Sequence, residues 1–239
     1  MEFDIITAFP GMFAGPLSHS IVKRAGDRGL VEVRVHDLRE YAADRHRKID
    51  DVPFGGGGGM VFMPGPLFAA VEAIQERHAS ESSRTILLCP QGTKYDQGQA
   101  RRLSGFGRLI LICGHYEGVD ERVREHLADE SISIGDYVLT GGEIPAMVLV
   151  DSLTRLQSGA LGDEDAAQRD SFCEAGFDFP HYTRPADFRG FKVPEVLLSG
   201  HHGRIAAWRK TRALETTARK RPDLLKPRAR RRAGTIQEH

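Results

Sequence analysis

One stretch near the middle of the chain constrains the fold more than any other. The apolar run Leu109–Ile112 opens directly into the glycine-containing loop Cys113–Gly118, and Ile132–Ile134 opens in the same way into Gly135–Pro145. A third copy of the pattern, Thr85–Gly92, lies upstream. Short apolar runs that end at glycine are typical of buried strands, and glycine lets a backbone approach a ligand closely. Each loop alone is consistent with a tight strand–helix turn. The three together predict a ligand-binding crevice at the carboxyl ends of adjacent parallel strands.

The remaining apolar pattern alternates between strand and helix periods. Strands are expected at Phe3–Thr7, Val31–His36, Thr85–Leu88, Leu109–Ile112 and Ser131–Ile134. Helices are expected at about Met12–Arg24, Pro66–Arg77, Asp96–Leu103 and Glu121–Leu127. This alternation predicts an α/β fold with a mainly parallel sheet. Pro145 fits the first turn of a further helix, because the N–H that proline lacks has no helical partner there.

The formal net charge of zero conceals an uneven distribution. From His201 to His239 there are 12 Lys or Arg residues against 3 Asp or Glu, whereas the first 200 residues carry 21 basic and 30 acidic side chains. A polyanion-binding appendage on an acidic body is the natural interpretation. The alternative is a solvated basic tail, which would suit Lys226–Arg232 in particular. Arg204–Arg221 carries apolar side chains at roughly helical spacing and is expected to fold.

Composition along the chain predicts two domains. A polar, glycine-containing stretch separates an α/β domain over residues 1–160 from a basic helical domain over residues 177–239, and residues 161–176 are expected to form a flexible linker. No apolar run approaches the roughly 18 residues of a membrane span, so no membrane association is expected. The three cysteines are far apart and form no CxxC pattern, which favours a reducing, cytoplasmic location.

Familiar nucleotide-binding motifs are missing. No GxGxxG follows the first expected strand, and no GxxxxGK[ST] occurs anywhere in the chain. The glycine tract Gly55–Gly59 lacks both the strand before it and the lysine after it that a phosphate loop needs. On its own, a flexible surface loop is at least as good an interpretation of this tract as a binding lid.

Several segments carry a resemblance to a known family. Gly114–Arg122 and Ser133–Glu143 closely resemble segments of the bacterial tRNA (guanine-N1)-methyltransferases, TrmD, which belong to the trefoil-knotted (SPOUT) RNA methyltransferases dependent on S-adenosylmethionine. The resemblance continues, in the expected order, through Asp44–Arg47 with Asp50 and Asp51, Pro53–Gly57, Asp170–Phe172, His181–Pro185 and Leu197–Gly200. It therefore spans most of the chain. It implies a deep C-terminal trefoil knot, which nothing in the pattern alone predicts.

The resemblance implies that the glycine loops hold S-adenosylmethionine. The cofactor contacts that it implies are Leu88, Pro90, Gly114, Tyr116, Glu117, Ile134, Gly135, Asp136, Tyr137, Val138, Leu139, Gly141, Gly142 and Pro145. Without the family context, Glu117 would be interpreted as a solvent-exposed loop carboxylate, and Tyr116 and Tyr137 as packing residues. No ligand spacing indicates a metal site, although Glu117 and Asp170 supply the oxygen ligands that a Mg²⁺ helper would need.

Methylating guanine N1 requires removal of a ring proton while the methyl group is transferred. A carboxylate can act as the base, and a cation can stabilise the negative charge that develops toward O6. By resemblance, Asp170 is the catalytic base and Arg155 the cation near the guanine. The competing structural interpretations are a capping box, in which Asp170 merely stands beside Ser171 at a helix start, and an ion pair between Arg155 and Asp151.

Contacts to the RNA are also implied by the resemblance. The substrate-binding residues expected are Arg45, His46, Gly59, Asp178, His181, Arg209 and Lys210. With Arg45 and His46 just upstream, the glycine tract could contact phosphates and close over an unstacked base. Family members are homodimers with shared active sites, which would set the cofactor loops of one chain against Asp170 of the other.

The resemblance therefore implies an enzyme that transfers a methyl group from S-adenosylmethionine to N1 of the guanine immediately 3′ of the anticodon in tRNA, nucleotide 37. One alternative is another SPOUT methyltransferase that acts on a ribose hydroxyl or a different base, against which the Asp170–Phe172 segment and the basic C-terminal region argue. A second alternative is a noncatalytic RNA-binding protein that keeps the fold. The glycine loops together with Asp170 and Arg155 argue against it.

Overall fold

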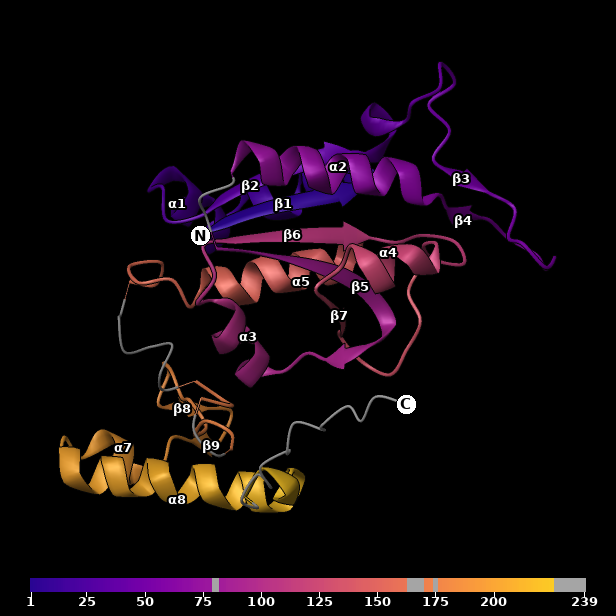
Figure 1. Cartoon of the computed structure of the whole chain (residues 1–239). Coiled ribbons are helices and arrows are strands. Elements are labelled where there is room, and N and C mark those ends of the chain that lie inside the picture. Colours follow the sequence, from indigo (N-terminus) through magenta and orange to yellow (C-terminus); the bar gives the residue numbers. More distant parts are fainter. Residues whose placement is uncertain (79–81, 163–169, 174–175, 226–239) are drawn as a thin grey trace. The chain divides into compact units, whose positions relative to one another are not determined.

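The chain divides into two compact units between residues 164 and 165. The computed structural model, drawn in Figure 1, describes residues 1–78, 82–162, 170–173 and 176–225. The linker predicted over residues 161–176 falls mostly outside the described residues, as does the basic stretch Lys226–Arg232. The predicted domain limits therefore stay predictions.

The first unit is built on a five-stranded sheet in which every neighbouring pair is parallel. Its strands are β1 (Glu2–Thr7), β2 (Glu32–Asp37), β5 (Ser83–Lys94), β6 (Arg108–Cys113) and β7 (Glu130–Ser133). The spatial order is β2-β1-β6-β5-β7, so the three strands that precede the glycine loops are neighbours. The α/β fold with a mainly parallel sheet is confirmed.

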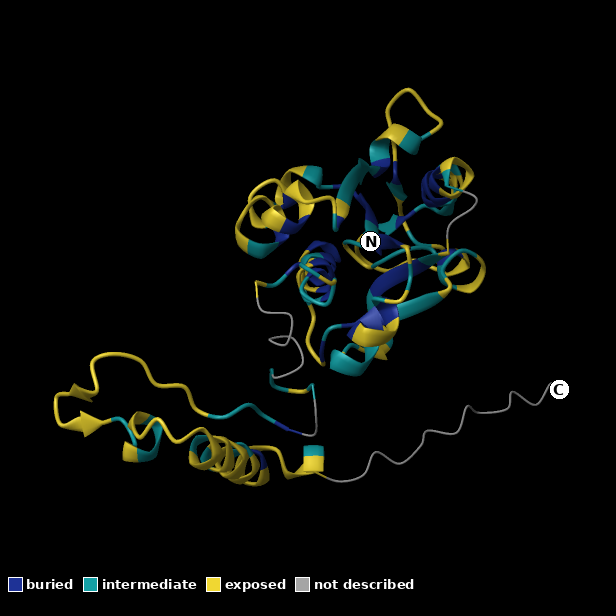
Figure 2. Cartoon of the chain, turned by 90° about the vertical axis from the view of Figure 1, so that its left-hand side faces the viewer, coloured by how far each residue is buried: buried dark blue, intermediate teal, exposed yellow. Residues whose placement is uncertain are grey.

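Helices cover both faces of this sheet, as Figure 1 shows for α2 and α5. The helices are α1 (Ser20–Asp27), α2 (Pro64–Arg77), α3 (Gln97–Leu103), α4 (Glu121–His126) and α5 (Glu143–Thr154). Alternate residues of β1 point to opposite faces of the sheet. Ile5 packs in the core beneath α5, and Ile6 packs in the core beneath α2. Every residue of β6 is buried because the strand lies between the two layers (Figure 2).

Two segments differ from the pattern-based prediction. The single helix expected over Met12–Arg24 is wrong: the chain instead forms 3-10 turns at Pro10–Phe13 (η1) and Pro16–Ser18 (η2) before α1. A proline cannot donate the hydrogen bond that would continue a helix, so each proline starts a new turn. Strand β5 also continues past Leu88, where the sequence predicted its end. Its pairing with β7 changes register between Leu88 and Thr93. Its glycine segment is therefore an irregularity within β5 rather than a turn into a helix.

Smaller elements complete the two units. In the first unit, η3 (Leu38–Tyr41) is followed by the short antiparallel strands β3 (Asp50–Asp51) and β4 (Val61–Phe62). The second unit contains the hairpin β8 (Asp187–Phe188) and β9 (Phe191–Lys192), α7 (Glu195–Leu198), α8 (His202–Lys220) and η4 (Pro222–Leu225). Helix α8 confirms that the less dense part of the basic region folds. None of the helices described in either unit is long and apolar enough to cross a membrane.

A buried charge network fixes the amino-terminal half of the sheet. Asp4 on β1 is 1% exposed and Arg108 on β6 is 0% exposed, and the two side chains are hydrogen-bonded to each other. His36 Nε2 lies 2.8 Å from the other Asp4 oxygen. Burial alone would raise the pKa of Asp4, but the hydrogen bonds from His36 and Arg108 and the charges of these side chains outweigh it, so the pKa lies below its ordinary value.

This lowered pKa makes stability depend on pH in a defined direction. A carboxyl group whose pKa falls on folding contributes stability above its unfolded pKa of about 3.9 and loses it as the pH falls through the folded value. Asp4→Asn should therefore lower the free energy of unfolding at pH 7 by about 3 kcal/mol, because it breaks a buried ion pair. The difference in the free energy of unfolding between the variant and the unchanged chain should become smaller below about pH 4.

Urea unfolding at pH 7 and at more acidic pH measures both effects. Asp27→Asn is the matched control, because Asp27 pairs with Lys23 at the surface and is 59% exposed. Its effect should stay within about 1 kcal/mol. Equal losses for the two variants at pH 7 would contradict a special role for the buried network.

Candidate functional site

The three glycine-containing segments meet around one pocket of about 290 Å³, which lies at the carboxyl ends of β6 and β7 and at the irregularity within β5. The first turn of α5 closes one side. Residues that line the pocket are Leu88–Pro90, Gly114–Gly118, Ile132–Gly135, Tyr137–Gly142 and Pro145. The crevice predicted from the three apolar runs is therefore present.

Backbone packing explains the glycines at the back of this pocket. Gly142 donates its N–H to the Gly114 carbonyl at 2.9 Å, and Gly141 forms an isolated bridge with His115. A Cβ on Gly142 would stand 2.6 Å from the Cα of Cys113, and one on Gly141 would stand 2.5 Å from Nδ1 of His115. Only residues without a side chain let the two loops cross this closely.

A fourth segment, from the β3–β4 hairpin, packs against the loop after β6. The N–H of Glu117 donates to the Met60 carbonyl at 3.1 Å, and Phe62 forms a parallel bridge with Val119. A Cβ on Gly59 would lie 2.5 Å from Cγ of Glu117. The glycine tract that begins at Gly55 therefore ends directly against the loop after β6, which brings a predicted substrate residue beside a predicted cofactor residue.

The predicted cofactor residues are brought together with one exception. All of them line the pocket except Asp136, which is 90% exposed and pairs with Lys94 at 3.2 Å. Six further residues line the pocket but were not among the predicted contacts: Cys89, His115, Gly118, Ile132, Ser133 and Thr140. All six lie within the three glycine-containing segments identified from the sequence. The roles of all these residues in binding stay predictions.

The segment before the glycine tract is a polar turn at the surface. The Asp44 carboxylate accepts hydrogen bonds from the N–H groups of His46 and Lys48, at 2.7 and 3.0 Å. Arg45 and His46 are exposed. Further along, Phe54 is fully exposed, which is unusual for so large an apolar side chain. Phe54 is not among the substrate residues expected from the sequence.

Arg155 does not reach the pocket within one chain. It caps the carboxyl end of α5, where its N–H donates to the Asp151 carbonyl at 3.3 Å. Helix α5 has 12 residues, which places Arg155 roughly 17 Å from the pocket end of the helix. Just beyond it, Gln157 contacts Met1 at the opposite end of the sheet, at 3.3 Å.

Other predicted residues lie together in the second unit. His181 Nε2 is 2.8 Å from the Asp178 carboxylate, and the Arg209 guanidinium lies 4.5 Å from the centre of the Phe179 ring. The N–H of Phe177 donates to the Thr217 hydroxyl at 2.8 Å, which anchors this segment on α8. The structure thus joins Asp178, His181 and Arg209, while Lys210 is exposed on the same helix.

Asp170 stands in a turn at the start of this segment. Its carbonyl accepts the N–H of Cys173 at 3.2 Å. The neighbouring Ser171 hydroxyl accepts the N–H of Asp178 at 3.0 Å, so Asp170 is tied to the turn that carries Asp178 and His181. The capping-box interpretation depends on Glu174, which lies outside the described residues.

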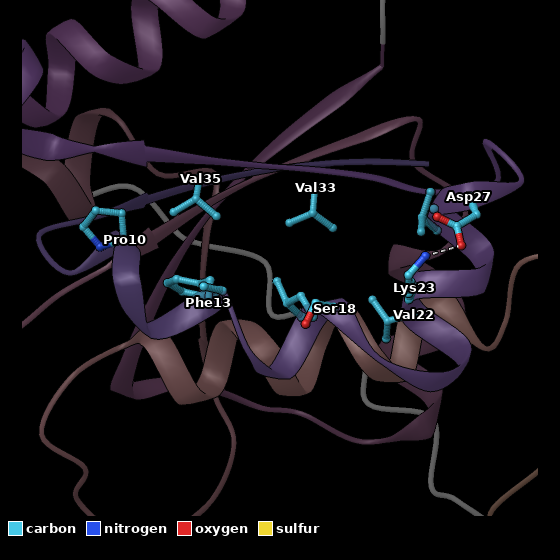
Figure 3. Close-up of a pocket in the computed structure, with 12 residues that line it drawn as sticks. Pro10, Phe13, Ser18, Val22, Lys23, Asp27, Val33 and Val35 are labelled. Atoms are coloured by element: carbon cyan, nitrogen blue, oxygen red, sulfur yellow. Dashed lines mark hydrogen bonds and ion pairs between the residues drawn. The ribbon is translucent and has the colours of Figure 1, made fainter.

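A larger cavity of about 420 Å³ lies between β2, η1, η2 and α1 (Figure 3). Its walls are mostly apolar, with Phe13, Val33 and Val35 among them. Its two charged side chains, Lys23 and Asp27, are paired with each other at 2.5 Å. Because the charged side chains of this cavity are paired with each other and its walls are mostly apolar, the glycine-lined pocket is the candidate site. In the part of the chain that is described, no cluster of His, Cys, Asp or Glu could hold a metal ion.

Comparison with known proteins points to one family. A family model described as tRNA (Guanine-1)-methyltransferase TrmD matches residues 1–227. The tRNA (guanine-N(1)-)-methyltransferase of Geobacillus kaustophilus is 54% identical over 94% of this chain and 91% of its own length. The enzyme of the same name from Halalkalibacterium halodurans is 54% identical over 95% and 92%. The crystal structure of tRNA (m1G37) methyltransferase from Aquifex aeolicus matches with a TM-score of 0.76 at 39% identity, over 94% of each chain.

Proposed function

The chain belongs to the TrmD family of tRNA (guanine-1)-methyltransferases, and we propose that it transfers a methyl group from S-adenosylmethionine to the guanine immediately 3′ of the anticodon, nucleotide 37. Methylation of guanine N1 in tRNA is its reaction. The family match along almost the whole chain carries this conclusion. It also favours N1 of guanine over the alternatives of a ribose hydroxyl, another base or a noncatalytic RNA-binding role.

The pocket fits S-adenosylmethionine as the methyl donor. Its back wall is backbone, because side chains at Gly141 and Gly142 would collide with the neighbouring loop. Backbone N–H and C=O groups from this wall and from Ile134, Tyr137 and Leu139 can bind the adenine edge. The Glu117 carboxylate offers a negative charge to the cationic end of the molecule. When bound, S-adenosylmethionine supplies an electrophilic methyl group.

Asp170 and Arg155 have separate roles in the reaction. The Asp170 carboxylate accepts the N1 proton of guanine as the methyl group is transferred, and the Arg155 guanidinium stabilises the negative charge that develops toward O6. The turn that ties Asp170 to Asp178 and His181 supports this assignment, because it links the base to two further candidate contacts for the guanine.

Asp170→Asn tests the base. The amide keeps the shape of the side chain but cannot accept the proton, so the single-turnover rate should fall by at least about 100-fold. Binding of S-adenosylmethionine should not change. The measurement uses undermodified tRNA and cofactor with a labelled methyl group, followed by mapping of the methylated nucleotide.

Label at nucleotide 37 is expected from the unchanged chain. Asp223→Asn is the matched control, since Asp223 pairs with Arg221 at the surface of the same unit. A near-normal rate for Asp170→Asn would remove Asp170 from the mechanism, and label at another nucleotide would overturn the proposed site of methylation.

Two chains share each active site. Within one chain, Arg155 lies at the opposite end of α5 from the pocket, a separation of roughly 17 Å that an arginine side chain cannot span. A second chain can bring its own Arg155 and Asp170 to the pocket of the first. The active unit is therefore a homodimer.

Complementation between two inactive chains tests this arrangement. One chain carries Asp170→Asn and the other carries Gly141→Trp, which blocks the pocket because even a Cβ at Gly141 has no room. With shared sites, a heterodimer contains one intact site and one doubly damaged site, so mixing should restore up to about half of the activity per heterodimer. If each chain built a complete site, verified heterodimers would stay inactive.

Two surfaces contact the tRNA. One is α8, which presents Arg209 and Lys210, and the other is the exposed turn with Arg45 and His46. Phosphate contacts from such cations provide affinity without sequence specificity. Phe54, fully exposed beside the glycine tract, provides an aromatic face on which an unstacked base can lie.

The basic residues of α8 differ in whether they form an ion pair. Arg212 is held by Glu215 at 2.6 Å, whereas Lys210 is in no ion pair among the residues described. Replacing Arg209 and Lys210 with alanine should weaken tRNA binding and lower the slope of log Kd against log salt by about one for each phosphate that is no longer neutralised. Arg212→Ala should change the slope less, and cofactor affinity should be unaffected. An unchanged slope in the double variant would show that these cations face solvent only.

The trefoil knot belongs to the same proposal. After β7 the chain returns to the loop after β6, where Gly141 pairs with His115, and then continues into α5. This return supports a knotted path through the pocket loops. A cytoplasmic location and a Mg²⁺ helper stay predictions.

A further inference from the structure

A buried carboxylate lies directly behind the pocket. Glu143 is the first residue of α5 and is 2% exposed. The Thr7 hydroxyl, at the end of β1, donates to its Oε1 at 2.7 Å, and the same hydroxyl accepts the N–H of Phe9 at 2.9 Å. The carboxylate thus ties the start of α5 to the end of a central strand. It does not itself line the pocket.

The other carboxylate oxygen faces a histidine that does line the pocket. Oε2 of Glu143 lies 3.9 Å from Nδ1 of His115. This nitrogen is buried and has no hydrogen-bond partner among the described residues. The ring stands between Phe9 and Tyr116, with ring centres 4.6 and 4.7 Å away. A buried polar atom normally has a partner, and the carboxylate is the group within reach.

Gly141 connects this pair to the shape of the pocket. Its backbone bridges to His115, and a Cβ there would collide with both Nδ1 of His115 and the Glu143 carboxylate. The wall at Gly141 therefore rests on the two side chains. The distance from Oε2 of Glu143 to Nδ1 of His115 is 3.9 Å. If the two side chains moved to hydrogen-bond distance, the backbones of His115 and Gly141 would move with them.

We propose that Glu143 is a positioning residue for the methyl-donor pocket, which holds the crossing of the two glycine loops through the interaction of its carboxylate with Nδ1 of His115 and a hydrogen bond from Thr7. This inference rests on the proposed function for the identity of the donor. The pKa of the Cys113 thiol lies well above its ordinary value, mainly because the thiol is buried and also because of the negative charge of Glu143. The thiol beside this pair therefore stays neutral and adds no second negative charge next to the carboxylate.

Glu143→Gln removes the charge and keeps both the shape and an oxygen that can accept from Thr7. The Kd for S-adenosylmethionine should rise about tenfold, as expected when one charge-assisted interaction is removed. The kcat at saturating donor should change less than about threefold, because no group that touches the guanine is altered. Calorimetric titration with S-adenosylmethionine measures the first quantity, and methylation of tRNA the second.

Glu121→Gln is the matched control. Glu121 is also the first residue of a helix, α4, but it is 62% exposed and pairs with Arg124. The two substitutions remove the same favourable interaction with a helix dipole, so only an effect specific to Glu143 supports the proposal. Equal donor affinities for the two variants would overturn it.

A double-mutant cycle with His115→Gln separates positioning from general destabilisation. If the two side chains act as a pair, the double variant should bind S-adenosylmethionine no more weakly than either single variant. Additive losses would overturn the proposal. If Glu143→Gln does not fold, His115→Gln alone should still raise the donor Kd about tenfold, and an unchanged Kd would overturn the proposal. Failure of the unchanged chain to bind S-adenosylmethionine would instead contradict the proposed function.

Discussion

The close crossing of two backbone loops at Gly141–Gly142 is the constraint on which the rest of the site depends. Because β6, β5 and β7 are adjacent and parallel, the loops after β6 and β7 come together with the irregular segment of β5. The loop after β7 then packs against the loop after β6 with no room for a side chain at either glycine. A pocket walled by backbone follows from this crossing, and α5 must start where the crossing ends. The position of the helix, and with it Arg155 at the far end, is thereby fixed.

Buried charge is used twice in the first unit, at opposite ends of β1. Asp4 pairs with Arg108 and His36 beneath α2 and holds three strands together. At the other end, Glu143 accepts from Thr7 and faces His115. An unsatisfied charge in a core is costly, so each carboxylate restricts the structure to arrangements in which its partners are present. The first network fixes the sheet, and the second fixes the loops that the sheet carries.

The residues proposed for the reaction come from different parts of the chain. The pocket belongs to the first unit and Asp170 to the second, and Arg155 stands a helix length from the pocket of its own chain. Of the two residues proposed for proton transfer and charge stabilisation, Arg155 therefore lies in the first unit but away from the pocket, and Asp170 lies in the second unit.

The sequence by itself determined the strand pattern, the loops that form the pocket and, through its resemblance to one family, the reaction. Apolar runs and glycines carry this information because strand burial and close backbone approach depend on local residue type. The break in the expected first helix follows from Pro16, a local signal that the apolar pattern did not include. Local pattern could not show that β5 continues past its irregularity, since this depends on pairing with β7. Nor could it show that Glu143 lies behind His115. Only the tertiary structure decided that contact, because it joins a residue of α5 to a residue of the loop after β6. A periodic pattern within one segment does not predict which residues of two separate segments lie close together.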